Sequence, residues 1–148
     1  MFEQRVEFLR SAYDIWNRGD VERWLPLHDE AVVFDLTEAH FYDLEPVYRG
    51  HEGLRAFWEA AHEPFGTFLL EPLSFSEGPD GVLVKVALRA RGAGSGAPAQ
   101  ARLFQVWRFR GGLLWHLETH GDEDKARQIV GLGEPATGHY PKPGPTRP

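Results

Sequence analysis

The sequence contains no cysteine and few basic residues. The absence of cysteine excludes a disulfide framework and a thiol nucleophile, and it is typical of cytosolic proteins, so we expect a cytoplasmic location. The chain has 16 Lys and Arg residues and 22 Asp and Glu residues, which gives a net charge of −6. This negative charge argues against nucleic-acid binding. No apolar run approaches the length of a membrane span, and residues 1–7 are too charged for a signal peptide, so we expect no membrane association.

Aromatic residues are abundant by contrast, with five tryptophans and an aromatic content of 13% in 148 residues. This composition predicts one globular domain, residues 1–132, with a large apolar interior or an aromatic-lined cavity for an apolar small molecule. The Pro- and Gly-rich residues 133–148 have too little apolar content to fold alone, and we expect an extended or disordered tail.

Hydrophobic periodicity predicts an α+β domain. Three successive strands form its centre: 82–91, 101–109 and 113–120. The remaining elements would be helices at 2–17, 21–27, 50–65 and 123–130 and strands at 31–36 and 67–76. The result is a curved antiparallel sheet of about four to six strands, covered by three helices from the N-terminal half, with a short C-terminal helix.

Alternation places polar groups within an apolar sheet face. Gln105 shares a face with Trp107 on one strand, and Thr119 shares a face with Leu117 on the next. The whole predicted face comprises Leu103, Gln105, Trp107, Phe109, Trp115, Leu117 and Thr119.

Several short segments resemble the SnoaL-like branch of the nuclear transport factor two superfamily, over about residues 5–132. They are 13–20 (YDIWNRGD), 29–35 (DEAVVFD), 48–57 (YRGHEGLRAF), 91–96 (RGAGSG), 106–112 (VWRFRGG) and 125–132 (KARQIVGL). Each segment alone is a weak signal, and their order and spacing together support the fold.

The resemblance implies a cone-shaped α+β barrel around a deep apolar pocket, and a homodimer formed through the outer sheet face. The superfamily includes ketosteroid isomerase, polyketide cyclases, scytalone dehydratase and limonene epoxide hydrolase, together with non-catalytic binding and structural modules. The fold therefore does not define the function.

Asp35 is the first candidate catalytic residue. It lies between Phe34 and Leu36 in an apolar strand and, by resemblance, at the position of the catalytic Asp of ketosteroid isomerase. If it points inward, the desolvated carboxylate can act as general base or acid. A solvent-facing or turn-capping Asp is the alternative.

The oxyanion-binding side departs from ketosteroid isomerase. By resemblance, the tyrosine of its first helix corresponds to Ala12, which has no hydroxyl, and its second Asp corresponds to Gln105. Gln105 can donate a hydrogen bond to an oxyanion and is the second candidate catalytic residue, although it could instead satisfy a neighbouring group. Tyr13 would reach the pocket only if the helix is rotated relative to this alignment.

The last strand has two possible registers. If His116, Glu118 and His120 face the pocket, they could hold a divalent metal or form an acid–base pair. If Leu117 is in the core, they lie outside and Thr119 faces the pocket, and we expect this second arrangement with no metal.

The remaining candidates are substrate-binding residues. They lie on the predicted walls of the pocket, on its helices and in a loop at its mouth: Tyr13, Trp16, His40, Tyr42, Trp58, His62, Trp107 and Thr119. The sequence thus predicts a cofactor-independent isomerase, cyclase or dehydratase acting on an apolar or polycyclic molecule. A non-catalytic ligand-binding module, or a dimeric structural module, of the same fold is the alternative.

Overall fold

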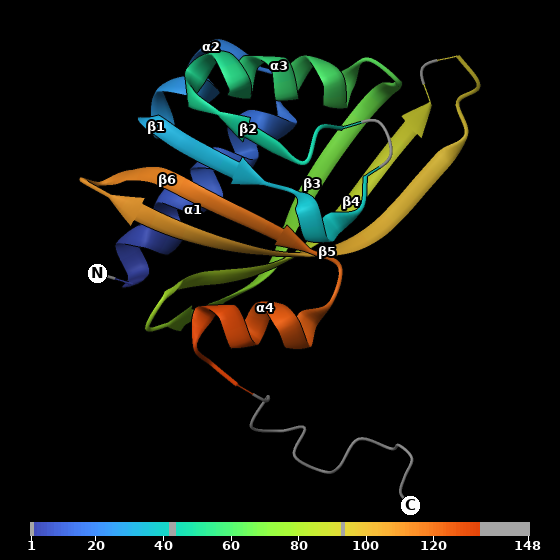
Figure 1. The fold of residues 1–148 in the computed structure, drawn as a ribbon. Helices are drawn as coiled ribbons and strands as arrows, with labels where there is room; N and C mark the ends of the chain where they lie inside the picture. The colour runs from blue at the N-terminus through green and yellow to red at the C-terminus, as the bar shows by residue number, and fades with distance from the viewer. Residues whose placement is uncertain (1, 42–43, 93, 134–148) are drawn as a thin grey trace, which may run out of the picture.

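In the part of the chain that the structure describes, six strands form one curved sheet with helices on both faces (Figure 1). The structure is a computed structural model, and it describes residues 2–41, 44–92 and 94–133. Its helices are α1 (Phe2–Asn17), α2 (Val21–Trp24), η1 (Leu25–Leu27), η2 (Thr37–Ala39), α3 (Gly50–His62) and α4 (Glu123–Val130). Its strands are β1 (His28–Asp35), β2 (Val47–Arg49), β3 (Phe65–Gly78), β4 (Gly81–Gly92), β5 (Pro98–Arg110) and β6 (Leu113–His120).

The strand order is β2-β1-β6-β5-β4-β3, which confirms the α+β class and the curved sheet. The sheet is mixed rather than wholly antiparallel, because β1 runs parallel to β6 while the other neighbours are antiparallel. It does not close into a full barrel, since β2 and β3 remain at its two edges.

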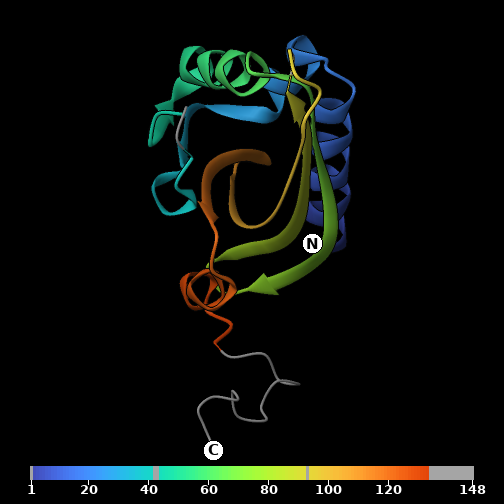
Figure 2. The same cartoon turned by 90° about the vertical axis from the view of Figure 1, so that its right-hand side faces the viewer.

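The two faces of the sheet have separate hydrophobic cores. The larger core joins α1, α2 and α3 to inward residues of the sheet such as Val84 and Trp107. The smaller core packs α4 on the opposite face, where Ala126 and Val130 cover Phe104 and Val106. In Figure 2, α3 lies across one end of the curved sheet and α4 at the other end. Phe104 and Val106, on the outer sheet face through which a homodimer was expected, are therefore buried within a single chain.

A β-bulge in β6 changes one predicted face. Arg108 pairs with His116, whereas the next residue, Phe109, pairs with Leu114. Trp115 is skipped, so Leu114 is fully buried and Trp115 packs on the guanidinium of Arg110 instead. The expectation that Trp115 shares the inner face with Leu117 is wrong for this reason. No helix in the described ranges is long and apolar enough to cross a membrane.

Asn17 joins the end of α1 to the edge strand β3. Its Nδ2 donates to the carbonyl oxygen of Leu70 at 2.8 Å, and its Oδ1 accepts from the Leu70 N–H at 2.8 Å. The neighbouring Trp16 Nε1 donates to the Phe68 carbonyl oxygen at 3.1 Å. These bonds satisfy backbone groups of an edge strand and fix α1 against the sheet.

Replacing Asn17 with alanine should lower the free energy of unfolding by about 1 kcal/mol, because both backbone groups of Leu70 lose a partner. Urea denaturation followed by circular dichroism measures this loss. The matched control is Arg18→Ala, which removes only an exposed ion pair with Asp14 and should change stability by less than about 0.5 kcal/mol. Equal effects of the two substitutions would contradict the role assigned to Asn17.

Candidate functional site

A small aromatic cavity lies between the helices and the inner sheet face. Its volume is about 30 Å³, which is room for roughly two water molecules. A polycyclic ligand of the kind expected from the sequence does not fit unless the lining side chains move. The lining residues, called here the aromatic cavity, are Ala12, Tyr13, Trp16, Trp24, Phe34, Phe57, Leu70, Gln105, Trp107 and Leu117.

Four polar side chains meet at one wall of this cavity and form a continuous hydrogen-bonded array. The Tyr13 hydroxyl donates to Gln105 Oε1 at 2.5 Å and accepts from Trp107 Nε1 at 2.9 Å. Gln105 Nε2 in turn donates to Thr119 Oγ1 at 3.2 Å. The structure therefore brings together four of the predicted site residues, and α1 is rotated so that Tyr13 reaches the pocket.

The array is buried, and its only acid is held in the protonated form. Burial raises the pKa of the Tyr13 hydroxyl far above its usual value, and the hydrogen bond from Trp107 opposes this only in part. Tyr13 is thus a neutral O–H donor throughout the physiological range. A phenol and an amide in an apolar wall are groups that can stabilise negative charge developing on a ligand oxygen.

Trp16 is the centre of the aromatic packing beside the array. Its ring centroid lies 4.6 Å from that of Trp58 and 4.9 Å from that of His62. Trp58 and His62 stack on each other at 4.5 Å, and His62 Nδ1 donates to the Trp58 carbonyl oxygen. Of these predicted wall residues, Trp16 lines the cavity, while Trp58 and His62 pack behind it.

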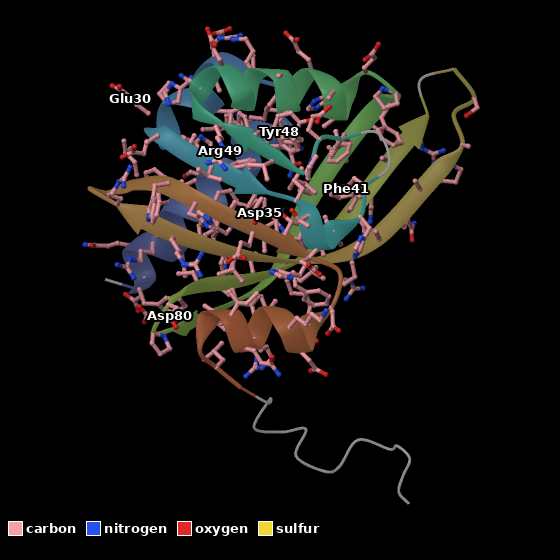
Figure 3. The ribbon with its side chains drawn as sticks, viewed as in Figure 1. Glu30, Asp35, Phe41, Tyr48, Arg49 and Asp80 are labelled. Atoms are coloured by element: carbon pink, nitrogen blue, oxygen red, sulfur yellow. The ribbon has the colours of Figure 1, made fainter. Side chains whose placement is uncertain are left out.

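A second, larger cavity opens beyond this packing. Its volume is about 230 Å³, and it is lined by His40, Phe41, Leu44, Ala60, Ala61, Pro64, Phe65, Phe68 and Leu88. Phe41 lies beside β4 (Figure 3). We call this space the mouth cavity, since His40 was expected at the mouth of the pocket. Tyr42, expected beside it, lies outside the described residues.

The two cavities are separated by an aromatic contact. Phe68 lines the mouth cavity, and its ring centroid lies 5.6 Å from that of Trp16, which lines the aromatic cavity. Phe68 and Trp16 therefore join the linings of the two cavities.

Asp35 does not point into either cavity. On β1 the inward residues are Val32 and Phe34, and Asp35 lies at the end of the strand beside β6 (Figure 3). Its Oδ1 accepts a hydrogen bond from the Thr37 N–H at 3.0 Å, as a turn-capping Asp does. Of the two orientations that the sequence left open, the structure shows the turn-capping one, because strand alternation allows either Phe34 or Asp35 inside, and the apolar Phe34 occupies the core.

The last strand has the register that places Thr119 inside, where it is 1% exposed. His116 and Glu118 lie on the opposite face, where Arg108 Nη1 donates to both, at 3.0 Å each. Burial and the Arg108 charge lower the pKa of His116. Within the described ranges, no three His, Cys, Asp or Glu side chains are placed to hold a metal ion.

His28 was not predicted as a site residue, and the structure buries it beside the aromatic cavity. Its Nδ1 lies 3.1 Å from the Trp24 carbonyl oxygen, and its ring packs against Trp24, Phe34 and Trp107 at centroid distances of 4.7, 5.5 and 6.3 Å. Burial lowers the pKa of His28 to about 4, so the imidazole is neutral at pH 7.

A family model for the SnoaL-like domain matches residues 9–117. The chain belongs to the SnoaL-like domain family. The match spans the sequence from α1 to β6, and with it the polar array except Thr119. A comparison with curated proteins found no match.

Solved structures share the fold of this SnoaL-like domain at low sequence identity. An NTF2-like protein of unknown function from Burkholderia pseudomallei is 22% identical, with a TM-score of 0.70 over 86% of this chain and 97% of that chain. TerC, co-crystallised with polyporic acid, is also 22% identical, with a TM-score of 0.70 over 86% and 98%. SalBIII is an epoxide hydrolase/cyclase-like enzyme with a role in pyran ring formation in the polyether salinomycin. It is 16% identical, with a TM-score of 0.67 over 81% of this chain and 92% of that chain.

Four residues that line the aromatic cavity of the SnoaL-like domain escaped the sequence analysis: Trp24, Phe34, Phe57 and Leu70. Phe57 lies within the helix predicted at 50–65, and Phe34 is the inward alternative to Asp35, so both had a signal in the sequence. His28 had none, because the register of β1 shifts between His28 and Val33 and interrupts the alternation.

Proposed function

We propose that this SnoaL-like domain is a cofactor-independent enzyme of the isomerase or cyclase type, acting by proton transfer on a small apolar ligand that bears a carbonyl oxygen. The observation that supports the proposal is the buried array of Tyr13, Gln105, Thr119 and Trp107 in the wall of an aromatic cavity. Family membership and the cyclase-like name of one structural neighbour agree with this class of reaction.

The array would bind the ligand oxygen. Gln105 uses one of its two amide N–H bonds on Thr119, which leaves the second as a donor. The Tyr13 O–H can turn from Gln105 to the ligand as negative charge develops, because a charge-assisted hydrogen bond is the stronger one. The surrounding aromatic rings exclude water and strengthen these interactions.

The size of the cavities limits the ligand. The mouth cavity, at about 230 Å³, exceeds the roughly 150 Å³ of an engineered cavity that binds benzene, so it admits a single ring. A ligand that reached the array from the mouth cavity would pass the Phe68–Trp16 contact. We therefore propose a monocyclic ligand in place of a polycyclic one.

Cyclohexanone and methylenecyclohexane, which differ only in the oxygen, test the oxygen-binding part of the proposal. Tryptophan fluorescence should report tighter binding of the ketone to the wild type, by about tenfold, from one additional hydrogen bond in a buried site. Tyr13→Phe and Gln105→Met keep the shape of the wall and should each reduce this preference severalfold. His116→Gln, on the opposite sheet face, is the matched control. Equal affinities for the two compounds in the wild type would contradict the proposal.

A non-catalytic ligand-binding module is the second candidate. It is favoured by the fact that the four polar side chains already hydrogen-bond to one another in a cavity of only about 30 Å³. Such a module would bind both compounds without any exchange of ligand protons with solvent.

A further inference from the structure

The outer face of β4 and β5 carries a group of basic side chains. On β4, Leu83 packs under α4 on this face, while Val84 and Val86 point into the larger core on the other face. Alternation therefore sends every second residue from position 85 onward to the outer face, beyond the helix. In Figure 1 the two strands extend away from α4 toward the upper right. The cationic side chains on this surface, called here the basic face, are Lys85, Arg89, Arg91 and Arg102.

The register of the two strands places these cations in a line. Along β4 the outer positions are 85, 87, 89 and 91, and cations occupy all of them except position 87. Position 87 is Ala87, and the residue that pairs with it on β5 is Arg102. Outer residues two apart on a strand are separated by about 7 Å, so a positive charge follows at each step over a line of about 20 Å.

Most of this positive charge has no partner within the chain. Arg89 Nη1 lies 3.3 Å from Glu71 Oε1, and Arg91 donates to a backbone carbonyl oxygen at 3.1 Å. In the described ranges, neither the Lys85 nor the Arg102 side chain has a hydrogen-bond or ion-pair partner. Like charges on neighbouring strands repel and destabilise a sheet. This excess of positive charge, in a chain of net charge −6, therefore indicates an anionic partner.

Exposed leucines beside the basic face favour a protein partner over a nucleic acid. Leu69 on β3 pairs with Arg89, and Leu73 lies further along β3. Each is 42% exposed, and these two are the exposed large hydrophobic side chains of the part of the chain that the structure describes. Apolar side chains of a partner protein can cover them, whereas a polyphosphate chain is repelled by the net charge of −6.

We propose that the basic face binds an acidic, extended segment of a partner protein, with carboxylates at alternate positions. Alternate side chains of an extended segment point to the same side with a spacing of about 7 Å, which matches the spacing of the cations. Apolar side chains of the same partner cover Leu69 and Leu73. The basic face lies on the opposite side of the sheet from the aromatic cavity, so this inference does not depend on the proposed function.

Fluorescence anisotropy of a labelled peptide tests the inference. The probe has eight residues that alternate glutamate and threonine, and it should bind the wild type more weakly as salt rises from 50 to 200 mM, because exposed charges are screened. Arg102→Glu should weaken binding by about tenfold, since an attraction becomes a repulsion, and Lys85→Glu should have a similar effect. The matched control is Arg23→Glu on α2, which makes the same change of net charge at a side chain that is 77% exposed. It should change the affinity by less than about twofold.

A second peptide of the same composition, with four glutamates followed by four threonines, tests the spacing. We expect the alternating peptide to bind the wild type severalfold more tightly. Equal losses in Arg102→Glu and Arg23→Glu, equal affinities for the two peptides, or no binding of the alternating peptide would overturn the proposal. Tighter binding of a single-stranded oligonucleotide of eight thymidines, lost in Arg102→Glu, would also overturn it, because the basic face would then be a nucleic-acid site.

Discussion

Replacing Trp16 with alanine should lower the free energy of unfolding by about 3–5 kcal/mol, the usual cost of removing a buried tryptophan side chain. Trp16 is 2% exposed and packs on the rings of Trp24, Phe57, Trp58, His62 and Phe68. The substitution would merge the aromatic cavity with a new void and would remove the bond to the Phe68 carbonyl oxygen. Urea denaturation measured by circular dichroism gives the change.

The conservative variant Trp16→Phe separates the two contributions. It keeps an aromatic ring but loses the indole N–H, so it should cost appreciably less than the alanine substitution. If Trp16→Ala lowered stability by less than about 1 kcal/mol, the aromatic cluster would not be the packed centre described here.

Acid should destabilise the protein through His28. Its pKa is about 4 in the folded state and near the model value of 6.5 when unfolded, so the unfolded state binds the proton more readily. The contribution of the neutral His28 to the free energy of unfolding is therefore fully present above about pH 6.5. It falls as the pH drops, and it is lost completely near pH 4. Between pH 7 and pH 5 this single group should cost about 2 kcal/mol.

His28→Gln isolates this effect, because glutamine does not titrate and its amide can still donate to Trp24. Urea denaturation of both proteins at pH 7, 6 and 5 gives the comparison. The wild type should lose about 2 kcal/mol more than the variant over this range. Parallel losses in the two proteins would contradict a buried, neutral His28.

Periodicity predicted most of the fold because each element buries one face. The helix over residues 2–17 and the three consecutive strands agree with α1, β4, β5 and β6 to within a few residues. The parallel pairing of β1 with β6 could not be predicted, because alternation reports which side chains are buried and not the direction of a neighbouring strand. The bulge at Trp115 also escaped, since it breaks alternation at a residue that could fit either face.

The candidate site was predicted where alternation was uninterrupted. Gln105, Trp107 and Thr119 lie on the inner face as expected, because β5 and the end of β6 pair in regular register. For Asp35 the sequence left two orientations open, and the structure shows the turn-capping one. His28 could not be found, because its importance comes from three aromatic rings on separate elements and from a hydrogen bond within a local turn.

The central claim is that the ligand binds in the aromatic cavity against Tyr13, Gln105 and Trp107. A nitrogen–proton NMR spectrum of the indole N–H groups during titration with cyclohexanone tests it most directly. We predict that the Trp107 signal, whose N–H donates to Tyr13, and the Trp16 signal shift, while the signal of Trp115, on the guanidinium of Arg110, does not. A shift of Trp115 alone, or no shift of Trp107 at saturating ligand, would contradict the account.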